Sequence, residues 1–434
     1  MGNFDLEKYI VEHIDDAISK GWIKVYYQPL IRGISRKVSR FEALSRWEDP
    51  KYGILIPDVF ISALEEHGLI HKLDGYVVEE SCKQFRHSIE EGKKVVPFSV
   101  NLSRKDFELC DIFEVIEASV KKYEISREFV IIELKEDAFN RDTEKIKEQL
   151  DRFRYAGYQI CMDDFGGGYS SLNIFKDFEI NEIKINMRFL KDFSPKACRI
   201  VASVVDMAKE IGILTIAERV ETEEQLRFLG SIGCEMAQGF LFCKPLPLED
   251  CMKEITHKGI EVEHPDEVKY FDEVGSINIL SPGSLTRVNS AGNSDMPVES
   301  AYESVIPYAM VEYDGNTFTY LYRNAEYMKT LKAIGYEDDD LNDISEDSDK
   351  KKLRKVIEET TDLGSCYSDF TINGYYCYFE ARVVARHIDR CAILFSLTNS
   401  NKDGKKVKLE KLDANLKHLY GIYNSVSMLD LEKN

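Results

Sequence analysis

The period of the hydrophobic pattern changes repeatedly between residues 20 and 250. Short runs rich in β-branched and aromatic residues alternate with stretches in which apolar residues recur at helical spacing. The predicted strands are 23–29, 39–47, 95–103, 129–135, 158–164, 182–186, 212–218 and 234–242. Strands that alternate with helices are typical of a parallel sheet, and this repeat predicts an α/β fold of the TIM-type (βα)8 class over residues 1–250.

The first connection, residues 31–38, is too short to contain a crossover helix. Parallel neighbours need such a crossover, whereas antiparallel neighbours can be joined by a short turn. We therefore expect the first two strands to form an antiparallel hairpin, which departs from the ideal barrel.

The pattern changes after the barrel. Residues 251–300 are polar and irregular, which predicts a linker with a covering flap. Residues 301–402 predict a smaller α+β domain of two strands, two helices and a closing hairpin. Six apolar residues then share one helical stripe and predict a connector helix over 403–434: Leu409, Leu412, Leu416, Leu419, Tyr423 and Val426.

The last twelve residues, 423–434, echo the start of the second domain. A repeated domain start is typical of a tandem array, so we expect further signalling domains in a longer protein. A frayed helix end with a chance similarity is the alternative.

Composition narrows the class of protein. The chain has 434 residues, of which 44% are hydrophobic and 31% charged, as in globular proteins of more than one domain. The net charge of −20 argues against binding to polymeric nucleic acid through a basic surface. No apolar run has the length of a membrane span. Ten cysteines without a CxxC pair favour reduced thiols, and so a cytoplasmic protein.

Polar residues stand at the carboxyl end of every predicted barrel strand. In order they are Gln28, Glu42, Asn101, Glu133, Asp163 with Asp164, Lys184, Glu218 and Gln238. Any one of them could simply begin a solvated loop, but in a TIM-type barrel these ends converge on one mouth. A ring of carboxylates repels itself unless cations lie among them. Oxygen ligands without histidine or cysteine indicate Mg²⁺ or Mn²⁺.

Asp163 and Asp164 are followed by three glycines, at 166–168. Two adjacent carboxylates are tolerable if each faces a metal ion, and the glycines free the next loop to approach a phosphate. A pair of bridged divalent ions is the usual machinery for in-line attack on a phosphodiester. Lys184, between two apolar neighbours, would orient or stabilise the attacking hydroxide.

The ordered motifs between residues 20 and about 248 resemble the EAL family of cyclic-di-GMP phosphodiesterases. They are YYQPL, FEALSRW, SVNLS, ELKE, DDFGGGYSSL, IKIN, AERVE and QGFLFCKPLP, and the naming tripeptide is Glu42-Ala43-Leu44. The resemblance implies a barrel with an antiparallel first strand. It also implies hydrolysis of cyclic di-GMP to linear pGpG with two Mg²⁺ or Mn²⁺ ions per site and, by analogy alone, a homodimer.

The resemblance assigns roles by position. It implies metal ligands at Glu42, Asn101, Glu133, Asp163 and Asp164. The positions of Lys184 and Glu218 match residues around the attacking water, and Glu136 matches the glutamate that holds the loop after 158–164. Substrate contacts are implied at Gln28, Leu44, Arg46 and Gln238.

Four positions depart from the family pattern. Asn186 replaces an aspartate near the second metal, Lys135 and Gly167 each replace a threonine, and Arg219 replaces a glycine. These changes put the catalytic rate in doubt more than ligand binding. They leave two hypotheses, an active phosphodiesterase, which the retained residues favour, and a cyclic-di-GMP receptor that does not hydrolyse its ligand.

The second domain resembles a PAS fold, which implies a sensory role. Its aromatic segments, 317–324 and 373–379, would either line a ligand cavity or, as is commoner, fill a plain core.

Overall fold

The computed structural model describes residues 3–140, 143–166, 172–186, 193–277, 307–336 and 348–400. The chain forms two compact units, Met1–Tyr302 and Glu303–Asn434, and each is described by itself. The predicted connector helix over 403–434 and Gly167 lie outside the described residues.

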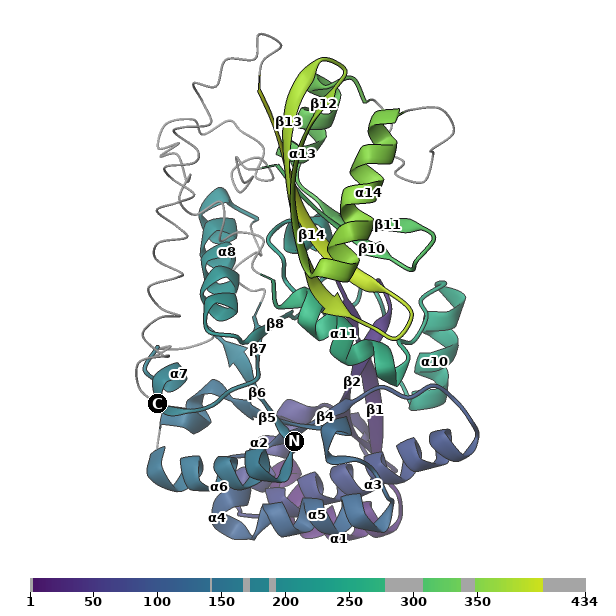
Figure 1. The fold of residues 1–434 in the computed structure, drawn as a ribbon. Helices are drawn as coiled ribbons and strands as arrows, with labels where there is room; N and C mark the ends of the chain where they lie inside the picture. The colour runs from purple at the N-terminus through teal and green to yellow at the C-terminus, as the bar shows by residue number, and fades with distance from the viewer. Residues whose placement is uncertain are drawn as a thin grey trace, which may run out of the picture. The chain divides into compact units, whose positions relative to one another are not determined.

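The first unit contains a closed barrel (Figure 1). Its strands are β1 (Ile23–Arg32), β2 (Val38–Asp49), β3 (Gly53–Leu55), β4 (Phe98–Leu102), β5 (Val130–Lys135), β6 (Gln159–Phe165), β7 (Glu182–Ile185), β8 (Leu214–Ala217) and β9 (Met236–Ala237). The order is β1-β9-β8-β7-β6-β5-β4-β2-β3, and β1 also pairs with β2, which closes the sheet. The eight predicted strands and the TIM-type barrel are confirmed, and β3 is an additional short strand on β2.

The antiparallel hairpin is also confirmed. β1 pairs antiparallel with β2 and with β9. β2 and β4 to β9 run parallel to one another. The short connection therefore reverses one strand without opening the barrel.

Helices surround the strands (Figure 1). They are α1 (Asn3–Ser19), α2 (Pro57–Glu66), α3 (Ile70–Glu90), α4 (Asp106–Leu109), α5 (Ile112–Lys122), α6 (Thr143–Ala156), α7 (Ile174–Asp177), α8 (Pro195–Glu210), α9 (Glu223–Ser231), α10 (Leu248–His257) and α11 (Pro265–Gly275), with 3-10 turns η1 (Arg127–Phe129) and η2 (Glu136–Asn140). The local sequence determines where some of these helices begin. Ser194 caps α8 ahead of Pro195, and Thr222 with Gln225 forms a capping box at α9.

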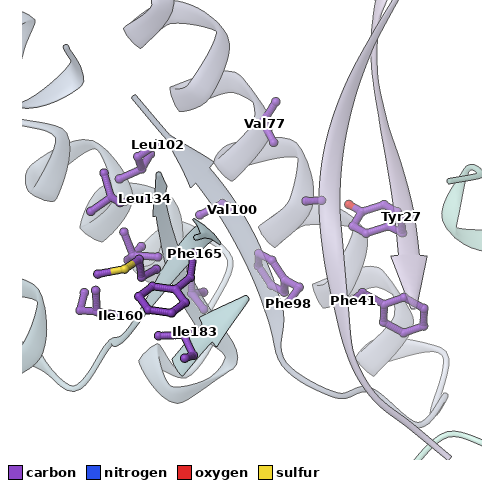
Figure 2. Close-up of a cluster of buried hydrophobic side chains, with 14 of the residues drawn as sticks. Tyr27, Phe41, Val77, Phe98, Val100, Leu102, Leu134, Ile160, Phe165 and Ile183 are labelled. Atoms are coloured by element: carbon purple, nitrogen blue, oxygen red, sulfur yellow. The ribbon is translucent and has the colours of Figure 1, made fainter. Parts of the chain in front are cut away.

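The alternation of side chains along each strand separates two apolar layers. One set packs under the helices, and Figure 2 shows Tyr27, Phe41 and Phe98 within it. The opposite set fills the middle of the barrel with Leu30, Ile131, Cys161, Ile216 and Met236. On β5, for example, Ile131 belongs to the barrel interior and Ile132 to the outer layer. On the parallel strands, residues two positions beyond the interior set therefore point into one end of the barrel, and on the antiparallel β1 the residue two positions before Leu30, Gln28, does so.

Residues 251–277 differ from the predicted linker. They contain most of α10 and all of α11, and α11 is capped by His264 with Pro265 at its first turn. The segment looks polar because its charged residues pair with charges of the barrel. Glu263 accepts a hydrogen bond from Arg32 at 2.8 Å, for instance, and Asp272 accepts another at 2.8 Å.

The described residues of the second unit, 307–336 and 348–400, form a five-stranded antiparallel sheet with two helices. Its elements are β10 (Tyr308–Tyr313), β11 (Phe318–Arg323), α13 (Ala325–Ala333), α14 (Ser348–Leu363), β12 (Ser365–Ile372), β13 (Tyr375–Arg386) and β14 (Cys391–Ser400). The order is β11-β10-β14-β13-β12. β12 was not predicted, because its sequence SCYSDFTI is mostly polar and half-exposed. Phe318 and Phe379, from the two aromatic segments, belong to the buried core.

No helix among the described residues is long and apolar enough to cross a membrane.

Candidate active site

Lys184 lies at the centre of the polar end of the barrel. Its side chain is 0% exposed, and its Nζ is 2.6 Å from Glu133 Oε2 and 2.9 Å from Glu42 Oε2. Glu218 Oε1 is 3.9 Å away. Burial alone would lower the pKa of Lys184, but the charges of Glu133 and Glu42 raise it well above its usual value. The side chain is therefore a permanent ammonium held between three strands.

Glu42 on β2 is the most fully paired carboxylate of the group. Besides Lys184, it accepts hydrogen bonds from Asn101 Nδ2 at 2.9 Å and from Gln238 Nε2 at 2.6 Å. Burial would raise the pKa of Glu42, but the Lys184 charge and these two amides outweigh burial and lower it. Glu42 is thus ionised and fixed in orientation.

If they were all ionised, the other carboxylates would carry more negative charge than one ammonium balances. Burial, with Glu42 and Asp163 nearby, raises the pKa of Glu133 to about 8 against the opposing effect of Lys184. Burial and Asp163 raise the pKa of Glu218 to about 8. The pKa of Asp163 is also raised, chiefly by burial. Such a set of clustered, perturbed carboxylates is typical of a functional site.

The end of β6 presents two carboxylates with an unusual backbone. Asp164 has a φ of 58°, and its amide donates to Asp163 Oδ1 at 2.8 Å. The buried Asn186, just after β7, donates a hydrogen bond to Asp164 Oδ1. A left-handed residue other than glycine stores strain, and such strain concentrates at functional sites.

Glu136 contacts the loop that follows β6. Its Oε2 accepts a hydrogen bond from the backbone amide of Gly166 at 3.0 Å, and Gly166 has a φ of 85°. This contact fits the loop-holding role that the sequence comparison implied. The neighbouring Lys135 is exposed and takes no part in it.

Gln238 and Gln28 extend the polar network. Gln238 Nε2 also donates to Gln28 Oε1 at 3.2 Å, and Gln28 Nε2 donates to the carbonyl oxygen of Cys243 at 3.0 Å. Gly239 permits this arrangement, because a Cβ there would lie 2.0 Å from the carbonyl oxygen of Val220. Gln238 Oε1, among the described residues, is buried without a hydrogen-bond partner.

Leu44 and Arg46 lie farther along β2 than Glu42. Arg46 Nη1 donates to its neighbour Ser45 at 2.7 Å, and the guanidinium lies 5.7 Å from the ring centre of Tyr26. Burial lowers the pKa of Arg46. Both residues are half-buried, and neither joins the hydrogen bonds around Lys184. Arg219, with a φ of 56°, and Glu221 are exposed.

The donor set fits hard cations. Glu42, Asn101, Glu133, Asp163 and Asp164 offer carboxylate and amide oxygens, which Mg²⁺ and Mn²⁺ prefer. No three of the described His, Cys, Asp or Glu residues are already arranged around one point as ligands. Lys184 instead contacts Glu42 and Glu133, and the unpartnered Gln238 Oε1 adds one more oxygen acceptor beside them.

Sequence reasoning missed one participant, Cys243. Its backbone oxygen fixes Gln28, and a backbone contact leaves no trace in residue type. The residues at the strand ends, in contrast, could be found in the sequence, because a polar residue there follows a run of mostly apolar ones.

Comparisons with known proteins match the part of the chain that forms the barrel. The EAL domain family model matches residues 11–245. The cyclic di-GMP phosphodiesterase NbdA of Pseudomonas aeruginosa is 30% identical over 244 residues, which cover 56% of this chain and 31% of that protein. The cyclic di-GMP phosphodiesterase RocR of the same species is 30% identical over 234 residues, which cover 53% and 59%.

A solved structure of the PaMucR phosphodiesterase in complex with c-di-GMP superposes with a TM-score of 0.53 at 30% identity, over 56% of this chain and 99% of that one. The FimX EAL domain from Xanthomonas citri, at 20% identity and a TM-score of 0.52, shows the shared fold. The chain matches only about a third of the length of relatives such as NbdA, of which it covers 31%. Because the family model spans more than half of its residues, the chain belongs to the EAL domain family.

Proposed function

We propose that the barrel hydrolyses cyclic di-GMP to linear pGpG with two Mg²⁺ or Mn²⁺ ions per active site. The observation that carries the proposal is the Lys184 ammonium shared by Glu42, Glu133 and Glu218 at the carboxyl ends of the strands. The names of the relatives NbdA and RocR support the same substrate.

Each residue of the cluster has a defined task in this proposal. Glu42, Asn101, Glu133, Asp163 and Asp164 would hold the ions. The ions, when bound, would supply an activated water and neutralise charge that develops on the phosphate. Lys184 orients the attacking oxygen because its ammonium is fixed by two carboxylates. Glu218, 3.9 Å from Lys184, would accept the proton of the attacking water.

The remaining residues position the substrate. Gln28, Leu44, Arg46 and Gln238 would contact the nucleotide and phosphate. Glu136 would hold the start of the loop after β6 through Gly166. The water oxygen adds to phosphorus, one P–O bond of the ring breaks, and the product is a linear dinucleotide.

A receptor that binds cyclic di-GMP without hydrolysis is the second candidate. One observation favours it: Asn186 donates an amide hydrogen bond to Asp164, where the family pattern has another carboxylate. An amide at this place adds no negative charge to attract a second cation.

Product analysis separates the two candidates. The full chain is incubated with cyclic di-GMP and Mg²⁺ or Mn²⁺, and pGpG is measured by chromatography beside binding by calorimetry. We expect turnover that disappears with EDTA and in the variant Lys184→Met. Binding with no product at either metal would support the receptor and exclude the enzyme.

For the second unit, we infer a PAS-like sensory domain within 301–402 and propose that the protein is cytoplasmic and forms a homodimer. The antiparallel sheet with two helices between its second and third strands supports the domain. Ten free thiols support a reducing compartment. Light scattering after size exclusion tests the dimer.

A further inference from the structure

Two cysteines lie in contact beside the candidate active site. The sulfur atoms of Cys243 and Cys251 are 3.9 Å apart, and both side chains are buried. Cys243 follows β9 outside any helix or strand, and Cys251 is in the first half of α10. The two thiols therefore belong to one short segment, the first in a loop and the second in a helix.

This segment is attached to β1 next to the predicted substrate contact. Leu246, between the cysteines, exchanges two backbone hydrogen bonds with Tyr27, at 2.6 and 3.1 Å. The carbonyl of Cys243 accepts from Gln28, and Gln28 accepts from Gln238, which also donates to Glu42. A chain of three hydrogen bonds thus connects the backbone of Cys243 to a predicted metal ligand.

We propose that Cys243 and Cys251 form a reversible disulfide, a redox modification site that lowers activity by displacing Gln28. The effect on activity rests on the proposed function, whereas formation of the disulfide does not. The oxidant is a hydroperoxide.

The chemistry balances with hydrogen peroxide. Cys243 Sγ attacks one peroxide oxygen, the O–O bond breaks, and a sulfenic acid and a water form. Cys251 Sγ then attacks the sulfenic sulfur, the S–O bond breaks, and a second water leaves with the remaining proton. The two thiols lose two electrons in total, and the peroxide gains them.

The attacking role falls to Cys243. The hydrogen bond between the two thiols lowers the pKa of the Cys243 thiol and raises the pKa of Cys251. Burial and the charge of Glu254 oppose this lowering, and the charge of Lys258, whose Nζ donates to the carbonyl oxygen of Phe242 at 2.6 Å, supports it. Because the thiolate is the nucleophile, Cys243 reacts first.

Formation of the disulfide moves residues that contact the candidate active site. The sulfurs must approach from 3.9 Å to about 2.05 Å. The amide of Cys251 is bonded to the Pro247 carbonyl at 2.9 Å and that of Cys243 to the Gly239 carbonyl at 3.2 Å, so both residues must shift, and Cys243 is the one that contacts Gln28. Its carbonyl then withdraws from Gln28, which loses the acceptor that fixes its amide.

Peptide mapping of the full chain tests the disulfide. Reduced protein is treated with hydrogen peroxide, free thiols are alkylated after unfolding, and the peptides are weighed. We expect a Cys243–Cys251 cross-linked peptide that disappears with dithiothreitol and in Cys251→Ser. Cys198→Ser, which removes a buried thiol on α8, should retain the cross-link. Two fully alkylated thiols in treated protein would overturn the proposal.

Turnover and cyclic di-GMP affinity, measured before and after oxidation, test the consequence. We expect a loss of about tenfold to a hundredfold in kcat/KM, the scale of a small misplacement of a positioning group. Cys251→Ser should keep its activity before and after peroxide, because a sulfenic acid on Cys243 without a partner thiol does not draw that residue away from Gln28. A complete cross-link with unchanged turnover and affinity would refute the regulatory effect. If the reduced protein shows no turnover, the proposed function fails, and affinity alone decides the effect of oxidation.

Discussion

The two ends of the barrel interior are both charged, but only one of them is balanced. At the amino end of the strands, Arg32 pairs with Glu263 and Asp272, each at 2.8 Å, and Arg40 pairs with Glu182. Lys209 on α8 lies 2.6 Å from Glu235. Each of the three fully buried carboxylates, Glu263, Glu182 and Glu235, has a cation of its own, and the partly exposed Asp272 bridges Arg32 and Arg40. A cation for each buried carboxylate is the condition under which buried charge is tolerated.

At the carboxyl end, across the apolar layer, the balance is different. Lys184 is shared by Glu42, Glu133 and Glu218, and Asp163 raises the pKa of two of them. The same barrel and the same residue types thus produce a structural network at one end and a cluster short of positive charge at the other. Both ends contain buried charges. The end in which the charges are balanced is a structural network, and the end that lacks positive charge is a candidate site for cations.

The largest expected effect is on activity at the unbalanced end. Glu42→Ala removes a predicted metal ligand that also accepts from Asn101 and Gln238. We expect turnover to fall by about two to four orders of magnitude while the barrel stays folded. Product chromatography and circular dichroism measure the two properties. Near-normal turnover in a folded variant would contradict the assignment of Glu42.

A substitution at the balanced end should lower the stability of the protein and not its activity. Arg40→Met leaves Glu182 buried without its cation, which costs about 3–5 kcal/mol in the free energy of unfolding. Turnover per folded molecule at low temperature should change little. Denaturant unfolding of the full chain measures the loss, with Lys20→Met as the control because the Lys20–Asp16 pair is exposed. A stable variant with reduced turnover would reverse the comparison between the two ends.

A third cluster of acidic residues, Asp74 and Asp106, contacts Ser103 just after β4. Its repulsion is reduced by a bound proton instead of a cation. The amide of Ser103 donates to Asp106 Oδ2 at 2.8 Å and to Asp74 Oδ2 at 3.3 Å. Burial raises the pKa of Asp106 to about 6, and burial with the Asp106 charge raises the pKa of Asp74. The folded state therefore binds a proton more tightly than the unfolded chain does.

This pair predicts a stability change with pH. The contribution of Asp106 is fully present below about pH 4, the unfolded value, and is lost as the pH rises through about 6. Asp106→Asn cannot ionise, so at pH 8 it should be about 1–3 kcal/mol more stable than the unmodified protein. At pH 4 the gain should vanish. Denaturant unfolding at both pH values checks it, and an equal gain at both would contradict the shared proton.

The smallest expected effect concerns Asn186. Asn186→Asp places a second carboxylate beside Asp164 and favours binding of another cation. We expect turnover to rise about two- to tenfold at limiting metal, and less at saturation. A metal titration of the rate measures this. An unchanged rate and metal dependence would place Asn186 away from the second ion.

Sequence and structure agree where the signal is local. The barrel strands and their polar ends could be read from period and residue type, as Glu133 after a run of apolar residues illustrates. The structure also brings Glu42, Lys184 and Gln238 together as that reading expected. The ligand and catalytic roles of these residues stay predictions.

The missed features depend on distant partners. Glu263 and Asp272 looked like parts of a polar linker, because nothing near them in the sequence indicates Arg32, more than 200 positions earlier. β12 was missed because its hydrogen bonds to β13 stabilise a strand whose own side chains are half-exposed. The hydrophobic periodicity of a sequence indicates which side chains face a core. It does not indicate ion pairs or strand pairing with distant residues.

The position of α11 has a consequence for how the protein is made. The family match ends at residue 245, yet the buried cations Arg32 and Lys209 find acceptors at Asp272 and at the carbonyl of Gly275. A nascent chain that has reached only the end of the family match would hold these cations without all their partners, so we expect the barrel to complete its folding only after α11 has emerged from the ribosome. Limited proteolysis of fragments that end at residues 250 and 277 would show the difference. The emergence of α11 is thus the step that commits the newly synthesised barrel to its folded state.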